Sequence, residues 1–371
     1  MSDIRDLLFK PVVDEDKFNP NFKQALNEPF QYARKVIETW AEGFEDRDGK
    51  FITEFQTTFN SAFWELYLFA VLKQLGYVVD FTKDRPDFCT SKFCIEATIA
   101  SHSKEGIPEW ERDYSFDPQW NLEDAVNYST IRLANAFISK ARKLRDSYSI
   151  LPHVEGKPFI IAIAPFEQPF FYVQSQHAIR RVLYGYDRVL AIDWDEHTRE
   201  VFGDVYLEQI DKGNGSTIPL GFFLNPEYAD VSAVIFSNVA TFGKARVLSD
   251  DHRIILIKSL RFNDYGLEPF NEVHEKEDYN ETLLDGLTIF HNPYAKNPLK
   301  PEDLLSNEIA HITYSLKDNE MVTNIPHQFL FQRIVTVINS DNTPEELNHI
   351  RQKLKETTST NNDSQYPKFH L

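Results

Sequence analysis

The sequence predicts an α/β protein in which a mixed central sheet is flanked by helices and followed by a C-terminal α+β extension. Three segments carry this prediction. Residues 53–75 contain an apolar helical run that Gly76 ends, because glycine is the usual residue just past a helix C-terminus. Residues 92–100 alternate between apolar and other side chains, as a strand does, and residues 157–164 are almost wholly apolar, as a fully buried strand is.

The elements follow one another in an order that divides the 371 residues into five parts. Further strands are expected at 77–81, 86–90, 188–194, 200–207, 217–224, 231–238, 253–260, 312–316 and 329–338, and further helices at 31–43, 122–146, 173–185 and 344–355. The segment 290–298 is expected to be a turn-rich surface loop. The predicted parts are a helical N-terminal lead-in (1–52), a core (53–165), a sheet extension (166–300), a C-terminal subdomain (301–356) and a disordered tail (357–371).

Composition limits the function classes. The chain has no apolar run of 18 residues and no basic start followed by an apolar stretch, so we expect no membrane span, no signal peptide and a cytoplasmic location. Its two cysteines, Cys89 and Cys94, are expected to be small core residues. The sequence lacks a phosphate-binding glycine-rich loop, a Gly-x-Ser-x-Gly elbow and a His-Glu-x-x-His element, which argues against nucleotide-driven motors, serine hydrolases and zinc proteases.

Glu65 is the first candidate functional residue. It is the one charged side chain between Asn60 and Leu72, in a helical stretch that is otherwise nearly all apolar. A buried carboxylate must be paired, protonated or bound to a metal, because an isolated charge costs several kcal/mol to bury. A structural ion pair, or a narrow exposed stripe on the helix, is the alternative explanation.

Asp87 and Glu96 form the second candidate feature. Strand alternation places Glu96 on the face opposite Ile95 and Ala97, and Asp87 opens the preceding strand directly after Pro86. A hairpin between the two strands would bring both carboxylates together. Two carboxylates in an apolar setting repel each other unless a cation lies between them, and Mg²⁺ prefers such hard oxygen ligands.

The order of a helical Glu, then Pro-Asp-Phe, then Ile-Glu-Ala-Thr, then a helix and a buried strand resembles the PD-(D/E)XK nuclease superfamily. The resemblance covers residues 53–165 and implies a restriction-endonuclease-like fold. It also implies a Mg²⁺ (or Mn²⁺) site formed by Glu65, Asp87, Glu96 and the backbone carbonyl of Ala97. The implied activity is metal-dependent hydrolysis of phosphodiester bonds, with DNA as the expected substrate and restriction or defence as the setting.

The chain departs from this motif at Thr98, where the family has a lysine that steadies the attacking water or the phosphoryl charge. A hydroxyl supplies no positive charge, so we expect the cation to come from the following helix. Arg132, Ala136 and Lys140 are four residues apart and share one helical face. We predict that Lys140 takes the role, with Arg132 as the second choice and a solvated basic face as the alternative.

A nucleic-acid partner conflicts with the net charge of −18 unless positive charge is concentrated locally. Residues 125–145 contain no acidic residue, and their five cations form a predicted phosphate-facing patch: Arg132, Lys140, Arg142, Lys143 and Arg145. The acidic segment 101–124 is interpreted as a lid or a DNA mimic over the site. Two alternatives stay open: an inactive nucleic-acid-binding module of the same fold, and a non-nuclease protein with structural ion pairs. A homodimer is compatible with each.

Overall fold

A computed structural model describes residues 3–111, 121–190, 202–266, 269–300, 302–338 and 343–356. The predicted disordered tail at 357–371 and part of the acidic segment 101–124 lie outside the described residues. The α-helices in the described ranges are α1 (Pro20–Leu26), α2 (Gln31–Trp40), α3 (Phe51–Thr57), α4 (Phe59–Gln74), α5 (Leu122–Lys143), α6 (His177–Tyr184), α7 (Phe242–Val247) and α8 (Pro344–Glu356). Within these ranges, no helix combines the length and the apolar character that crossing a membrane requires.

A mixed sheet of seven strands forms the centre of the fold, in the order β1-β2-β3-β8-β11-β12-β13. Strands β2, β3 and β8 run parallel, as do β11 and β12, whereas the pairs β1/β2, β8/β11 and β12/β13 are antiparallel. The bounds are β1 (Phe88–Cys89), β2 (Cys94–Ser101), β3 (Phe159–Phe166), β8 (Ala233–Phe236), β11 (Thr288–His291), β12 (Ala310–Ser315) and β13 (Glu320–Asn324). The predicted α/β class with a mixed central sheet is confirmed.

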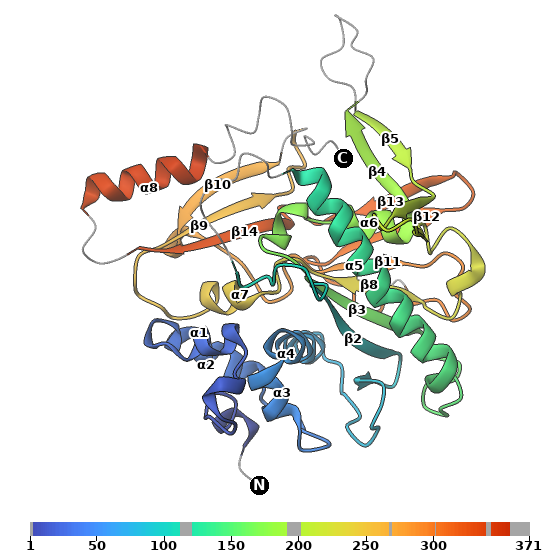
Figure 1. The fold of residues 1–371 in the computed structure, drawn as a ribbon, viewed down its shortest axis with the longest axis horizontal. Coiled ribbons are helices and arrows are strands. Elements are labelled where there is room, and N and C mark those ends of the chain that lie inside the picture. Colours follow the sequence, from blue (N-terminus) through green and yellow to red (C-terminus); the bar gives the residue numbers. More distant parts are fainter. Residues whose placement is uncertain are drawn as a thin grey trace, which may run out of the picture.

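Helices cover both faces of the β2–β3 part of the sheet. The parallel pairing of β2 and β3 requires a crossover connection, and α5 supplies it. Ile95 and Ile160 belong to the core shared with α4, whereas Cys94 and Ile161 belong to the core shared with α5. The continuous apolar run of β3 follows from this two-sided burial. Figure 1 shows α1–α4 grouped on one side of the sheet and α5 running across it.

A second sheet of three antiparallel strands has the order β10-β9-β14, with β9 at Ile255–Arg261, β10 at Phe270–Glu275 and β14 at Leu330–Val337. Helix α8 lies against it (Figure 1), and Lys258 donates a hydrogen bond to the backbone carbonyl of Leu354. Two small hairpins complete the strands: β4 (Tyr186–Leu190) with β5 (Phe202–Tyr206), and β6 (Gln209–Asp211) with β7 (Thr217–Pro219).

The structure corrects three local predictions. The helix predicted at 53–75 is two helices, α3 and α4, separated at Thr58, whose φ of −126° and ψ of 46° leave the helical region. The buried Gln56 binds backbone groups of Lys10 and Val12, which ties the end of α3 to the N-terminal segment.

The other two corrections concern strands. Residues 77–81 are not a strand, because Asp80 turns the chain by accepting hydrogen bonds from the backbone and hydroxyl of Thr82. The predicted surface loop at 290–298 begins inside the sheet: β11 ends at His291, and Phe290 is fully buried because strands lie on both sides of it.

Candidate functional site

The β1–β2 hairpin brings Asp87 next to Glu96, as predicted. Phe88 pairs with Ile95, so Asp87, the residue before β1, lies opposite the segment that holds Glu96. The Oδ2 atom of Asp87 accepts a hydrogen bond of 2.7 Å from the backbone N–H of Ala97. This bond fixes the Asp87 carboxyl group beside Ala97, the middle residue of the segment Glu96-Ala97-Thr98.

Glu96 is buried, with only 1% of its surface exposed, and it carries two ion pairs on one oxygen. Its Oε1 atom lies 2.6 Å from Nζ of Lys140 and 2.9 Å from Nζ of Lys143. Its Oε2 atom is also buried but accepts no hydrogen bond from the described part of the chain. One oxygen of the carboxylate therefore holds two lysines, whereas the other is buried without a hydrogen bond, and the Tyr148 hydroxyl also interacts with this carboxylate.

The two lysines reach Glu96 because they are three residues apart on α5 and so lie on the same side of the helix. The cation predicted for the place that Thr98 cannot fill, Lys140, contacts the motif carboxylate. Lys143 was expected only in the phosphate-facing patch, and its bond to Glu96 was missed. Its ammonium group also lies 5.0 Å from the centre of the Tyr148 ring.

The acidic groups influence one another electrostatically. Burial raises the pKa of Asp87 to about 6, with a further contribution from the charge of Glu96, while Lys140 and the Ala97 N–H act in the opposite direction. Burial raises the pKa of Glu65 to about 8; the charge of Asp87 adds to the shift and Arg47 opposes it. The charges of Asp87 and Glu96 therefore act on Glu65, although it belongs to α4 on the other side of the sheet from α5.

Two residues near this site were missed in the sequence. Arg47 donates hydrogen bonds to the backbone carbonyls of Lys83 and Pro86, so it holds the segment that leads into Asp87. Tyr148 is buried beside Glu96, and burial together with the Glu96 charge holds the pKa of its hydroxyl well above the usual range. The acidic turn around Arg47 gave no signal for this contact, since the partner carbonyls lie 36 and 39 residues away.

The remaining predicted site residues, which include Thr98 and the three arginines of the predicted patch, lie in different parts of the structure. Thr98 is partly buried on the same side of β2 as Glu96. Arg132 donates to the carbonyl of Ser101 at 2.6 Å, which places it at the end of β2.

The two remaining arginines follow Lys140 along the chain. Arg142 is exposed, while Arg145 donates to the carbonyl of Glu227 and lies 4.9 Å from the centre of the Tyr228 ring. The five predicted cations therefore do not face a single surface.

One observation speaks against the predicted metal site, and another supports it. Among the described residues, no group of three or more His, Cys, Asp or Glu side chains is arranged to hold a metal ion. The buried Oε2 atom of Glu96 and the carboxyl group of Asp87 nevertheless fit a hard cation, because Mg²⁺ commonly takes one or two carboxylates and keeps several waters. The residues present fit Mg²⁺ with Glu96 and Asp87 as ligands and Glu65 nearby.

Comparisons of the chain with protein-family models, curated proteins and solved structures gave no match.

Proposed function

We propose that the chain is a metal-dependent phosphodiesterase of the PD-(D/E)XK type that cleaves nucleic acid, with DNA as the expected substrate. The observation that carries the proposal is Glu96, a buried carboxylate with two lysines on Oε1 and a buried acceptor without a hydrogen-bond donor at Oε2. The sequence of elements supports it: α4 with Glu65, the hairpin with Asp87 and Glu96, the crossover helix α5 and the strand β3 follow in the order of a restriction-endonuclease-like core.

In the proposed mechanism, Asp87 and Glu96 would hold the cation, and Glu65 is the third acidic residue that the resemblance assigns to it. The backbone carbonyl of Ala97 is the further ligand that the resemblance implies. A divalent cation would lower the pKa of a bound water and neutralise charge on the scissile phosphate. Lys140 orients Glu96 through its 2.6 Å ion pair and supplies the positive charge that Thr98 lacks.

The substrate reaches the site along α5 in this proposal. Arg142 is exposed on the helix that carries Lys140 and Lys143, so it is the best candidate for a contact with the phosphate backbone. Because the whole chain carries a charge of −18, affinity for nucleic acid would depend on Arg142 and the exposed part of Lys143, and it would decrease steeply with salt.

The test is cleavage of supercoiled plasmid and of single-stranded DNA by the purified chain with Mg²⁺ or Mn²⁺. Glu96→Ala and Asp87→Asn should abolish cleavage, and so should EDTA. Glu320→Ala, which changes an exposed acidic residue on β13 at the opposite end of the central sheet, is the matched control and should leave cleavage unchanged. Thermal melting of each variant shows whether it is folded.

The departure at Thr98 supports a second candidate, an inactive nucleic-acid-binding module of the same fold. Salt-dependent binding of DNA without cleavage in either metal would favour this module over the enzyme. Absence of both binding and cleavage in a folded preparation would overturn both candidates.

A further inference from the structure

Two cysteines face each other across the β1–β2 hairpin. Cys89 is the last residue of β1, Cys94 is the first residue of β2, and the two are paired in the strand register. Their sulfur atoms lie 3.4 Å apart, and Cys94 also donates a weak hydrogen bond of 3.5 Å to the carbonyl of His153. The sequence contains two cysteines, so each is the other's one possible disulfide partner within the chain.

The backbone places the two cysteines at a non-hydrogen-bonded position of the antiparallel ladder. The N–H of Thr90 donates to the carbonyl of Phe93 at 2.9 Å, one position beyond the cysteines, whereas the carbonyl of Cys89 accepts from the N–H of Asp80. At such positions the Cα atoms are about 4.5 Å apart and the side chains are close together. Disulfides span Cα separations of about 4.4–6.8 Å, so the pair can be joined without moving the strands apart or together.

The burial of the two thiols limits which partner can react with them. Cys89 is 2% exposed and Cys94 is 0% exposed, so a bulky partner cannot contact either sulfur in the closed hairpin. The strand β1 is a two-residue edge strand, and the turn after it is exposed at Ser91 but held by an ion pair between Lys92 and Asp303. Elements with so few backbone bonds open locally more readily than the interior of a sheet. A covalent reaction accumulates its product even from a rarely opened state, whereas reversible binding of a ligand does not.

We propose that Cys89 and Cys94 form a site of reversible oxidation, at which a hydroperoxide converts the two thiols into a disulfide. One thiol sulfur attacks a peroxide oxygen, the O–O bond breaks, water leaves, and the sulfur becomes a sulfenic acid. The second thiol attacks this sulfur, the S–O bond breaks, and a second water leaves. Two thiols and one H₂O₂ thus give one disulfide and two waters, with both electrons passing from the thiols to the peroxide.

The position of the partner thiol favours the disulfide over further oxidation. The second step is intramolecular, because the sulfur atoms are already 3.4 Å apart and need to approach only to the bonded distance of about 2.05 Å. A hydroperoxide fits the site because it is small enough to enter a briefly opened hairpin, whereas oxidation by a larger disulfide compound requires a mixed disulfide that these buried positions do not accommodate.

The disulfide lies beside the carboxylate pair of the candidate site. Phe88 pairs with Ile95, so positions 87 and 96 are the next facing pair, and strand alternation puts their side chains on the same face as the two cysteines. The new bond therefore ties the hairpin two residues from both carboxylates, next to the hydrogen bond from the Ala97 N–H to Asp87. The oxidised hairpin should open less often, which slows hydrogen exchange of the Ala97 amide.

The test is oxidation of the folded chain with H₂O₂ in EDTA, followed by alkylation of the remaining thiols, digestion with trypsin and mass spectrometry. Trypsin cleaves after Lys92, between the two cysteines, so the disulfide joins the peptides 84–92 and 93–104. We expect this linked pair as the main product, with loss of alkylation at both cysteines. Dithiothreitol should separate the pair and restore both thiols. Hydrogen exchange of the Ala97 amide should be slower in the oxidised chain than in the reduced chain.

Cys94→Ser is the matched control, because it keeps Cys89 and removes its partner. This variant should give no linked pair, and its Cys89 should form a sulfenic acid that dimedone traps. If the variant does not fold, the digest of the unchanged chain remains the test. Two unreacted thiols in the folded chain, disulfides between two chains, or a linked pair that forms only after unfolding in urea would overturn the proposal. The measurement needs neither bound metal nor nucleic acid, so this inference succeeds or fails independently of the proposed cleavage activity.

Discussion

The two lysines on Glu96 should be energetically coupled, and a double-mutant cycle measures the coupling. Lys140 is the more buried, with 22% of its side chain exposed and a distance of 2.6 Å, whereas Lys143 is 48% exposed at 2.9 Å. Lys140→Met should lower the free energy of unfolding by about 1.5–3 kcal/mol, which is typical of a hydrogen bond to a charged group. Lys143→Met should cost less than about 1 kcal/mol, because solvent weakens the ion pair of an exposed lysine.

The double variant should lose more than the sum of the single losses. Each single variant leaves one lysine on Glu96, but the double variant leaves a buried carboxylate with neither, a situation that costs about 3–5 kcal/mol. Urea unfolding followed by circular dichroism in metal-free buffer at pH 7 gives the four free energies. A Glu96→Gln background is the control, and there each lysine substitution should cost less than about 1 kcal/mol. Additive losses, or unchanged losses in that background, would refute the shared-oxygen arrangement.

Three further predictions concern the same site. Burial and Asp87 raise the pKa of Glu65 from 4.5 to about 8, so the folded state binds the extra proton between these values and stability should decrease as pH rises through this range. Urea unfolding at pH 5 and pH 8 should show a smaller decrease in Glu65→Gln, and an identical pH dependence would contradict the assignment. Lys140→Met should reduce metal-dependent cleavage about a hundredfold or more, and adding Thr98→Lys to that variant should restore part of it in the plasmid assay, since Thr98 lies on the Glu96 side of β2. No recovery would show that the two positions do not substitute for each other. Arg142→Gln should reduce the slope of log affinity for DNA against log salt by about 1, measured by fluorescence anisotropy, and an unchanged slope would remove Arg142 from the interface.

The parts of the fold that the sequence predicted are those with strong local periodicity. In the segments that form α4, β2, α5 and β3, the spacing of apolar residues matches the burial of those residues. The alternation of side chains along β2 predicts the face of the sheet on which Glu96 lies. Lys140 could be predicted as the cation of the site because α5 has no acidic residue after Glu123 and Asp124, which leaves its positive charges uncompensated within the helix.

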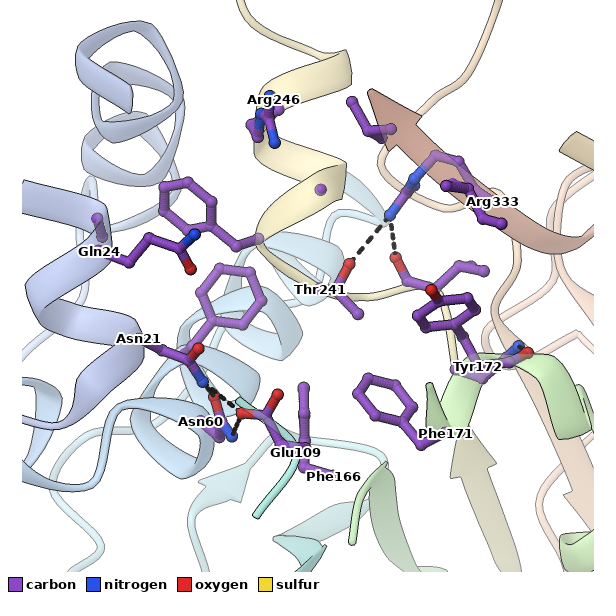
Figure 2. A pocket seen from close by; sticks show the side chains of 18 of the residues that line it. Asn21, Gln24, Asn60, Glu109, Phe166, Phe171, Tyr172, Thr241, Arg246 and Arg333 are labelled. Carbon is purple, nitrogen blue, oxygen red and sulfur yellow. Dashed lines mark hydrogen bonds between the residues drawn. The ribbon is translucent and has the colours of Figure 1, made fainter. Parts of the chain in front are cut away.

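The rest depends on contacts that local patterns do not contain. Arg47 donates hydrogen bonds to carbonyls of the loop before Asp87, and the helix pair α3–α4 separates the two along the chain. Strand β11 was missed because the turn residues Asn292 and Pro293 follow it directly and hide a short buried strand. A cavity of about 540 Å³ between the N-terminal helices, α7 and β14 (Figure 2) draws its lining residues from positions as far apart as Asn21 and Val337, so it is a product of tertiary packing alone.

Trp64 has a consequence for how the acidic site is built. Its indole N–H donates a bond of 3.1 Å to the carbonyl of Ala162 in β3, so α4 is joined to the sheet by a directional contact in addition to apolar packing. Apolar packing alone tolerates small rotations of a helix about its own axis, because it has no preferred direction. Glu65 is the next residue, and the indole bond therefore sets the direction in which its carboxyl group leaves the helix. The hydroxyl of Tyr67, which donates to the carbonyl of Leu283 at 2.8 Å, is a second directional contact of α4, so a helix that is apolar on nearly every side still acquires a defined rotational setting.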